Sequence, residues 1–377
     1  MRNTVATLGL LALGALSLGC GDDDPAASDG DGAGGATGSG GNGTGASGGN
    51  GSGASGGNGA AGGDGSQPAA LEDMHLSGRF EQSDAAGPRS TWSGTSIGIR
   101  ISGTGVEVEL AGDGGVFFEV LVDGASVGSF ETSGGLATYP LADGLADGEH
   151  DVTLYRRTEG WTGVVQFRSF TPAAGGGIVP SPSPFAHRLE LIGDSITCGY
   201  GVLGPNGDCN FTTDTESAYE TYAAIAARNT SADAHLVAYS GKGVFQNYGG
   251  DKNELMPELW LRTLTGEPAP WDFASWTADA VVINLGTNDF SAPLGAGDFV
   301  PAYAALLGAV RERYPQAALF AVTWEHWGAD KVRGWPTQWP RAATARRRSC
   351  PSTSRRRRAS AATTTPARPP TRAWASS

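Results

Sequence analysis

The sequence has few residues that bind metals and no loop that would cradle a phosphate. Only five histidines and four cysteines occur among 377 residues, and they form no cluster at the spacing of a zinc site. A phosphate-binding glycine loop with its lysine in place is also absent. The sequence therefore predicts that the protein uses no cofactor and no metal.

Large apolar side chains are almost absent from residues 21–70, where Gly, Ala, Ser, Asn, Thr and Asp dominate. Such a segment cannot bury enough surface to offset the entropy lost on ordering, so we interpret it as a flexible tether. The low-complexity Ser-Gly-Gly-Asn-Gly units within it are not a folded repeat. The first folded domain is expected to begin near residue 71.

Residues 1–20 have the features of an export signal. Arg2 precedes an apolar run that is too short to span a bilayer comfortably and is typical of a secretory signal. The run ends in Leu16-Ser17-Leu18-Gly19-Cys20, which resembles the bacterial lipobox. We expect Cys20 to carry a lipid that anchors the protein to a membrane, at the cell surface or in the periplasm. The alternative is an ordinary signal peptide that contains Cys20.

Two further cysteines, Cys198 and Cys209, are close in sequence. Outside the reducing cytoplasm such a pair can form a disulfide that closes a small loop. We therefore expect a bond between Cys198 and Cys209, which leaves Cys350 unpaired.

Acidic residues are absent from residues 341–377, which contain ten arginines, although the whole chain has a net charge of −13. A basic tail usually indicates binding to nucleic acid or to an anionic surface. Apolar periodicity is also lost after about Trp335, and the composition becomes rich in Arg, Pro, Ala and Thr. GC-rich coding DNA gives this composition when it is read out of frame. We therefore interpret residues 336–377 as an out-of-frame tail and expect no nucleic-acid partner.

A shift of the reading frame gives this tail a different content. The third base of most of its codons is unconstrained, and one consistent choice reads Asp-Tyr-His across the codons of Thr363, Thr364 and Thr365. Resequencing the gene tests the hypothesis. An intact frame, with the tail present in the mature protein, would contradict it.

Residues 71–172 have the pattern of an all-β domain. Apolar and polar residues alternate in several short runs, for example at residues 96–101, 106–110, 116–122 and 152–155. Asp113-Gly114 and Asp123-Gly124 are both good hairpin signals. Short strands at regular spacing predict a β-sandwich or jelly roll.

A proline-rich joint, residues 173–187, precedes a region of alternating strands and helices at residues 188–335. Near-continuous apolar runs of this kind predict a doubly wound parallel α/β sheet of the flavodoxin-like class. Active sites in such sheets lie at the carboxyl ends of the strands. The expected strands are residues 188–192, 234–239, 280–285 and 318–323, and the expected helices are residues 216–229, capped by Thr215, and 299–314.

Three short motifs follow the ends of the first three of these strands. They are Gly193-Asp194-Ser195-Ile196-Thr197, Tyr239-Ser240-Gly241-Lys242-Gly243 and Gly286-Thr287-Asn288-Asp289. The set resembles the SGNH (GDSL-like) hydrolases, whose four blocks supply Ser, Gly, Asn and His. The resemblance covers about residues 188–330 and includes three of the four blocks in order.

This resemblance implies a role for one residue of each motif. Ser195 would be the nucleophile that attacks an ester carbonyl. The backbone N–H groups of Ser195 and Gly241 and the side-chain amide of Asn288 would bind the oxyanion. Asp194 and Asp289 would brace the loops. The surroundings of Ser195 do not match the Gly-x-Ser-x-Gly pattern of the α/β-hydrolases.

The longer run from Gly193 to Gly201 and the run from Tyr239 to Val244, placed after an all-β region, resemble the carbohydrate esterases of family two. That resemblance implies a jelly roll before an SGNH domain, with removal of O-acetyl groups from a polysaccharide such as xylan or glucomannan and no metal. The expected partner is an acetylated polysaccharide.

The catalytic histidine of the fourth block is not identifiable in the chain as printed. The Asp-Tyr-His of the shifted frame resembles the place where the family carries it. Of the five histidines present, only His326 follows an expected strand end, and it is the alternative base. The neighbouring aromatic cluster Trp324, Trp327 and Trp335 could stack on sugar rings or simply pack.

Two other functions stay open at this point. A chain without its base could be a non-catalytic carbohydrate-binding lipoprotein, because a serine without a base keeps only a residual rate. A GDSL-type lipase or thioesterase would use the same motifs on another acyl group.

Overall fold

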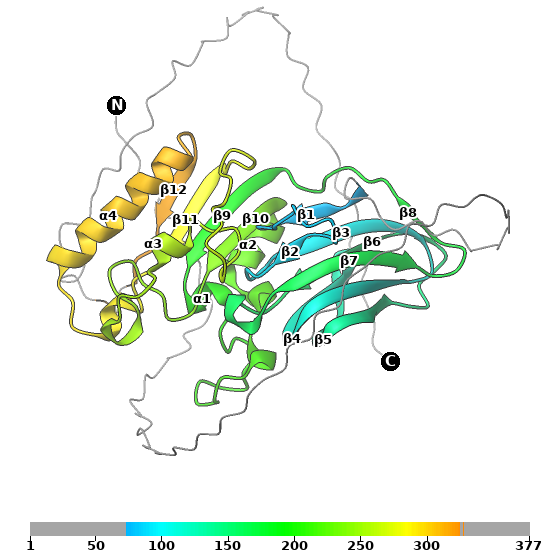
Figure 1. The fold of residues 1–377 in the computed structure, drawn as a ribbon, viewed down its shortest axis with the longest axis horizontal. Coiled ribbons are helices and arrows are strands. Elements are labelled where there is room, and N and C mark those ends of the chain that lie inside the picture. The colour runs from blue at the N-terminus through cyan, green and yellow to red at the C-terminus, as the bar shows by residue number, and fades with distance from the viewer. Residues whose placement is uncertain (1–72, 325–326, 328–377) are drawn as a thin grey trace, which may run out of the picture. The chain divides into compact units, whose positions relative to one another are not determined.

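The computed structural model describes residues 73–324 and Trp327. The predictions for the signal segment with Cys20, the tether, His326, Trp335 and the out-of-frame tail lie outside these residues and stay predictions. Figure 1 shows two β-sheets, one in the first part of the described chain and one in the second.

The first sheet has eight strands, and all its pairings are antiparallel. Its strand order is β1-β3-β6-β4-β7-β2, with β5 paired to β4 and β8 paired to β3. The strands are β1 (His75–Ser77), β2 (Arg89–Ser90), β3 (Ser96–Gly103), β4 (Val106–Val122), β5 (Ala125–Ala142), β6 (Gly148–Arg156), β7 (Val165–Pro172) and β8 (Gly177–Val179). The all-β prediction is confirmed, whereas the jelly roll stays a prediction.

One of the two expected hairpin turns forms. Asp123 and Gly124 join β4 to β5 with φ of 52° and 79°, as a type I′ turn requires. The turn predicted at Asp113-Gly114 is wrong, because both residues lie inside β4. Strand β5 pairs with β4 before and after that point, β7 pairs with β4 as far as Gly112, and the Asp113 carboxylate accepts the N–H of Val164. The register between β4 and β5 shifts between Gly114 and Phe117, so Asp113-Gly114 lies beside an irregularity within the strand and not in a turn.

The second sheet has four parallel strands in the order β10-β9-β11-β12, as Figure 1 shows. Neighbouring residues of β9 point to opposite faces of the sheet. On one face, Leu191 belongs to the core cluster that contains Ala223 and Ala227 of α2. Ile192 belongs to the cluster that contains Phe299 and several other residues of α4. The strands are β9 (His187–Gly193), β10 (Ala232–Ala238), β11 (Ala280–Asn284) and β12 (Ala318–Ala321), and the helices include α2 (Tyr222–Thr230), α3 (Met256–Leu259) and α4 (Ala296–Arg313). The predicted parallel α/β sheet is confirmed.

The helix predicted from residue 216 begins later than expected. Helix α2 starts at Tyr222, and the Thr221 hydroxyl, in place of Thr215, accepts the N–H of Ala224 at 3.3 Å. Residues before it form two short 3-10 helices, η3 (Thr213–Thr215) and η4 (Ala218–Glu220). The backbone carbonyl of Glu216 accepts hydrogen bonds from the Arg157 guanidinium, so it is not available to a longer α-helix. Among the described residues, no helix is both long enough and apolar enough to cross a membrane.

Candidate active site

The register of the parallel sheet brings the three predicted motifs together. Gly193, at the end of β9, pairs with Ala238 of β10 and with Asn284 of β11. The segments that follow these three residues therefore leave the same edge of the sheet from adjacent strands. Ser195, Gly241 and Asn288 belong to those segments, two to four residues beyond the paired positions.

Ser195 opens a single helical turn, α1 (Ser195–Cys198), directly after β9. Asp194 caps this turn, because its carboxylate accepts the N–H of Ile196 at 3.0 Å. Burial raises the pKa of Asp194 to about 7. Its second carboxyl oxygen is buried without a hydrogen-bond partner among the described residues. The cap holds the half-buried Ser195 at the edge of the sheet.

Gly241 lies in a turn after β10 with φ of +78°. No atom lies within 4 Å of the place where a Cβ would be, so the backbone angle and not the space requires glycine here. The carbonyl of Gly241 accepts the N–H of Tyr248. The turn is thereby fixed on one side, while the Gly241 N–H has no acceptor in the part of the chain that the structure describes.

Asn288 and Asp289 connect the third motif to the second. The Asn288 side chain is buried and donates to the carbonyl of Lys242 at 2.9 Å. The Asp289 carboxylate accepts the backbone N–H groups of three successive residues, Val244, Phe245 and Gln246. Burial raises the pKa of Asp289, and these hydrogen bonds oppose the shift. Asp289 therefore braces the loops, in agreement with the prediction.

Three N–H donors at this edge have no acceptor among the described residues. They are the backbone N–H of Ser195, the backbone N–H of Gly241 and the second side-chain N–H of Asn288. Buried or half-buried donors are normally paired, so a set of three on adjacent loops is informative. It is the kind of arrangement that receives the negative oxygen of a tetrahedral intermediate.

The four histidines that the structure describes do not supply a base at this edge. His187 begins β9 at the opposite end of the strand. His75 and His150 belong to the first sheet, where their rings contact Ser181 and Asp123. His235 is buried within β10 and stacks on Trp276 at 3.7 Å, and burial lowers its pKa well below the usual value.

The predicted disulfide between Cys198 and Cys209 is not formed, and both cysteines are free. Helix α1 turns the Cys198 side chain into the protein interior, where its thiol lies 3.6 Å from a carboxyl oxygen of Glu159. Cys209 remains half-exposed in the following loop. The two cysteines are close in sequence, which suggested the bond. The Cys198 side chain points into the interior, and a disulfide requires both side chains to point toward each other.

Sequence reasoning missed Glu159, which comes from the first domain. It lies between β6 and the short 3-10 helix η2 (Gly160–Thr162) and is fully buried. Its carboxylate accepts both the N–H and the hydroxyl of Ser240, the residue before Gly241. No local pattern marks this residue, because its partner lies 81 positions further along the chain.

Glu159, Cys198 and Glu216 are the one group of potential metal ligands among the described residues, with their ligand atoms within 4.8 Å of one another. Both oxygens of Glu159 already accept hydrogen bonds from Ser240. Burial raises the pKa of Glu216 to about 9, with the neighbouring Glu159 as the second cause. A protonated Glu216 is a poor metal ligand, and we assign no metal there.

The raised pKa of Glu216 predicts a dependence of stability on pH. Between the ordinary value near 4.5 and the folded value of about 9, the folded chain holds a proton that the unfolded chain has lost. This contribution to stability is complete below about pH 4.5 and is lost as pH rises toward 9. Glu216→Gln keeps the shape of the neutral acid and cannot lose a proton. The melting temperature of the variant minus that of the parent should therefore increase as pH rises. Thermal unfolding at pH 5, 7 and 9 checks this.

The charged and titratable groups near Glu216 include Glu159, Arg156, Arg157 and Cys198, and all four are present in the parent and in the variant. Asp194 also titrates in this range, but it is common to the two proteins and cancels in the difference between them. A melting-temperature difference that does not change between pH 5 and pH 9 would contradict the protonated state of Glu216.

Exposed aromatic side chains surround the same edge. Tyr200 follows α1 and stacks on Phe211 with ring centroids 3.8 Å apart, and Tyr248 is 71% exposed beside the Gly241 turn. Trp324 follows β12 and donates its ring N–H to the side chain of Asn284 at 3.0 Å. Trp327, in contrast, is buried among the core aromatic residues. Of the expected aromatic cluster, Trp324 is thus partly exposed, Trp327 packs and Trp335 is not described.

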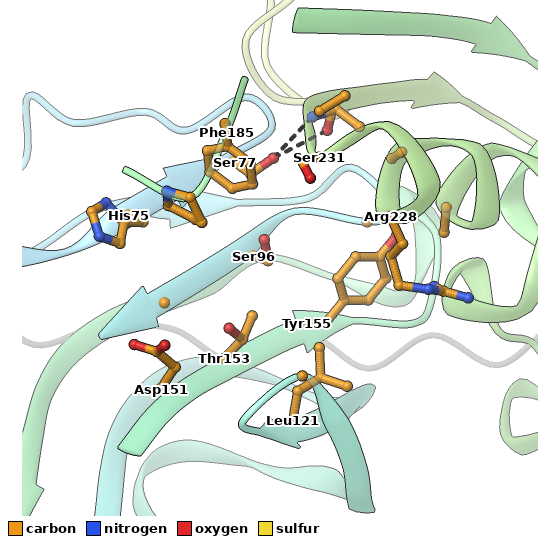
Figure 2. Close-up of a pocket in the computed structure, with 18 of the residues that line it drawn as sticks. His75, Ser77, Ser96, Leu121, Asp151, Thr153, Tyr155, Phe185, Arg228 and Ser231 are labelled. Atoms are coloured by element: carbon orange, nitrogen blue, oxygen red, sulfur yellow. Dashed lines mark hydrogen bonds between the residues drawn. The ribbon is translucent and has the colours of Figure 1, made fainter. Parts of the chain in front are cut away.

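A pocket of about 350 Å³ lies elsewhere in the molecule. Figure 2 shows it between the first sheet, with His75, Ser96 and Thr153, and the end of α2, with Arg228. Its lining includes Ala232 and Ala234 at the beginning of β10, the end opposite to the Gly241 turn. The pocket therefore does not include the candidate active site.

Two family models match the chain. The model described as carbohydrate esterase 2 N-terminal matches residues 76–182. The model of the GDSL-like lipase/acylhydrolase family matches residues 191–370, a range that runs into the arginine-rich stretch. The two matches correspond to the first and the second sheet of the structure.

Characterised relatives agree with both matches. The cellulase/esterase CelE of Acetivibrio thermocellus is 40% identical over 245 residues, 65% of this chain, and the chain covers 30% of that protein's length. An acetylxylan esterase / glucomannan deacetylase of Cellvibrio japonicus is 26% identical over 66% of the chain and 71% of the relative.

A solved structure extends the likeness from sequence to fold. It is a family two carbohydrate esterase from Clostridium thermocellum in complex with cellohexaose. It superposes with a TM-score of 0.66 at 38% identity, over 70% of this chain and 82% of that one. The all-β domain and the domain with the parallel sheet thus both have counterparts in one group of enzymes, and the chain belongs to the carbohydrate esterases of family two.

Proposed function

We propose that this protein removes O-acetyl groups from a plant-type polysaccharide such as xylan or glucomannan, with Ser195 as its nucleophile. The observation that carries the proposal is the set of three unpaired N–H donors on the loops beside Ser195. An oxyanion needs such donors in place before the reaction, because preorganised donors cost no reorganisation when the charge develops.

The nucleophile and the oxyanion donors of the reaction lie on this edge. The Ser195 hydroxyl gives its proton to a base and its oxygen bonds to the acetyl carbon, while the carbonyl oxygen becomes negative. The N–H groups of Ser195 and Gly241 and the amide of Asn288 bind that oxygen. The sugar hydroxyl then leaves with the proton, and water attacks the acetyl-serine to release acetate and restore Ser195.

The base is the part of this mechanism that the described residues lack. We propose that the residues after about 335 are out of frame and that the restored frame supplies a histidine from the Asp-Tyr-His stretch. The DNA sequence around the codons of residues 331–346 is the decisive observation. His326 remains the alternative base within the chain as printed.

Hydrolysis of p-nitrophenyl acetate and release of acetate from acetylated xylan test the proposal. The frame-restored protein should turn over both substrates, and the chain as printed should be much slower. If the restored protein binds xylan but hydrolyses neither ester, the protein is a carbohydrate-binding module. A preference for long-chain acyl esters over acetate would favour a lipase or thioesterase.

Three observations support a polysaccharide as the substrate. The exposed rings of Tyr200, Tyr248 and Trp324 lie on segments that leave the same edge of the sheet, and rings of this kind can stack on sugars. The Cellvibrio japonicus relative is named an acetylxylan esterase / glucomannan deacetylase. The Clostridium thermocellum structure contains cellohexaose, a β-linked glucan chain.

Asn288→Ala should lower kcat of the frame-restored protein by about 10²–10³-fold, because it removes one oxyanion donor. KM should change little, since the donor acts mainly in the transition state. The matched control is Asn229→Ala, which alters an exposed residue at the end of α2 and should leave kcat unchanged. Equal effects of the two substitutions would remove Asn288 from the site.

Export and anchoring remain part of the proposal. We propose that the protein is a lipoprotein attached through Cys20, with residues 21–70 as the tether and a jelly-roll first domain. Expression in a bacterium followed by Triton X-114 partition tests the anchor. The parent should enter the detergent phase, and Cys20→Ala should enter the aqueous phase. A parent found in the aqueous phase would contradict the lipid.

A further inference from the structure

Glu159 contacts two of the three segments that form the candidate active site. Its carboxylate accepts the Ser240 N–H at 2.6 Å and also the Ser240 hydroxyl. The thiol of Cys198, three residues after Ser195, lies 3.6 Å from the same carboxylate. One buried side chain of the all-β domain is therefore in contact both with the turn that contains Gly241 and with the helix that begins at Ser195.

The hydrogen bond to Ser240 leaves the neighbouring N–H group free. The Ser240 N–H is bound by Glu159, whereas the next N–H along the chain, that of Gly241, has no acceptor among the described residues. Glycine at φ of +78° with open space around it has little intrinsic preference to stay in that conformation. Contacts from other segments must therefore hold the turn, and Glu159 supplies one of them, beside the Tyr248 N–H and the Asn288 amide.

Both carboxyl oxygens of Glu159 act as acceptors, one for the Ser240 N–H and one for the Ser240 hydroxyl. Burial raises the pKa of the neighbouring Glu216. The Glu159 N–H points to a carboxyl oxygen of Glu216 at 3.4 Å. Arg156 is buried close by and donates to the Glu159 carbonyl. A charged acceptor binds the Ser240 N–H more strongly than a neutral one would.

We propose that Glu159 is a positioning residue of the esterase site, through which the all-β domain holds the Ser240–Gly241 turn in its oxyanion-binding conformation. This inference rests on the proposed function, in which the Gly241 N–H binds the oxyanion. It gives the first domain a role in the reaction itself, in addition to any contact with the polysaccharide.

Hydrogen–deuterium exchange in the full chain tests the positioning without any need for turnover. Glu159→Ala removes both acceptors, and Glu159→Gln keeps the shape with a neutral oxygen. Exchange at residues 239–243 should become about tenfold faster or more in Glu159→Ala and less so in Glu159→Gln, as the loss of a hydrogen bond to a charged group implies. Exchange in β11 should stay unchanged, which reports that the sheet is intact.

The matched control is Glu216→Gln, the same substitution in the other member of the pair. Glu216 makes no hydrogen bond to Ser240 in the structure, and glutamine resembles its protonated form. Exchange at residues 239–243 should therefore remain as in the parent. Equal exchange in this segment for the parent and both Glu159 variants would overturn the proposal.

Kinetics of the frame-restored protein separate this inference from the proposed function. Glu159→Gln should lower kcat about tenfold or more with little change in KM, and Glu216→Gln should not. If the parent shows no turnover that depends on Ser195, the proposed esterase fails, while the exchange experiment still decides whether Glu159 holds the turn. Unchanged kcat in Glu159→Gln, in a parent that does turn over, would overturn the role in catalysis.

Discussion

Ser195→Ala should lower kcat of the frame-restored protein toward acetyl esters by about 10⁴-fold or more. Removing the nucleophile of a serine hydrolase leaves only the rate that substrate binding and the oxyanion donors supply. The capped turn that holds Ser195 depends on the Asp194 carboxylate and the Ile196 N–H, which the substitution does not touch. The loss should therefore appear in kcat while the fold is kept. Steady-state hydrolysis of p-nitrophenyl acetate measures it.

The appropriate control is Ser240→Ala, because Ser240 is the other serine in the motifs at this edge of the sheet. Its backbone N–H, and with it one of the two hydrogen bonds to Glu159, survives the substitution. We expect a loss of less than about tenfold. A larger loss in Ser240→Ala than in Ser195→Ala would exchange the roles that we assign to the two serines.

The same substitution in the chain as printed gives a second test. Residues that act as a unit in catalysis are strongly non-additive, so removing the serine from a chain that already lacks its base should cost little. A small effect in the printed chain and a large one in the restored chain would support the missing histidine. A large effect in both would mean that the printed chain already contains its base, and His326→Ala should then abolish activity.

The sequence predicts the second sheet well because its inner strands β9 and β11 are largely apolar and largely buried. Apolar runs such as Val281–Ile283 are typical of the strands of a parallel sheet with both faces covered. Once these strands are placed, the motifs that follow them must share one edge of a parallel sheet. The meeting of the segments of Ser195, Gly241 and Asn288 follows from that topology.

The errors arise where a distant contact overrides a local pattern. Asp113-Gly114 has the composition of a turn, but pairing with β5 before and after it, and with β7 up to Gly112, keeps it within a strand. Glu216 has helix-forming neighbours, but Arg157 of the first domain binds its carbonyl. Glu159 was missed for the same reason. Its partner is far along the chain, and a single buried acid has no periodicity that would reveal it.

A buried ion pair between the two domains leads to the largest expected loss of stability. Arg79, just after β1, contacts Glu190 of β9 at 2.5 Å, and neither side chain is exposed to solvent. The guanidinium also donates to the carbonyls of Trp260 and Arg262. Arg79→Ala leaves the Glu190 charge buried without its partner, which typically costs about 3–5 kcal/mol of folding free energy. The midpoint of urea unfolding should fall accordingly.

Arg89→Ala is the matched control, because Arg89 also bridges the two domains, through Glu267 at 2.8 Å, but is partly exposed. Its loss should cost about 1 kcal/mol or less. The double variant Arg79→Met with Glu190→Gln removes both charges and should recover much of the stability that Arg79→Ala loses. If it recovers nothing, the cost of Arg79→Ala comes from lost packing and lost hydrogen bonds to the two carbonyls. Partial recovery would show that both the unpaired charge of Glu190 and the lost contacts of Arg79 contribute to the loss of folding free energy.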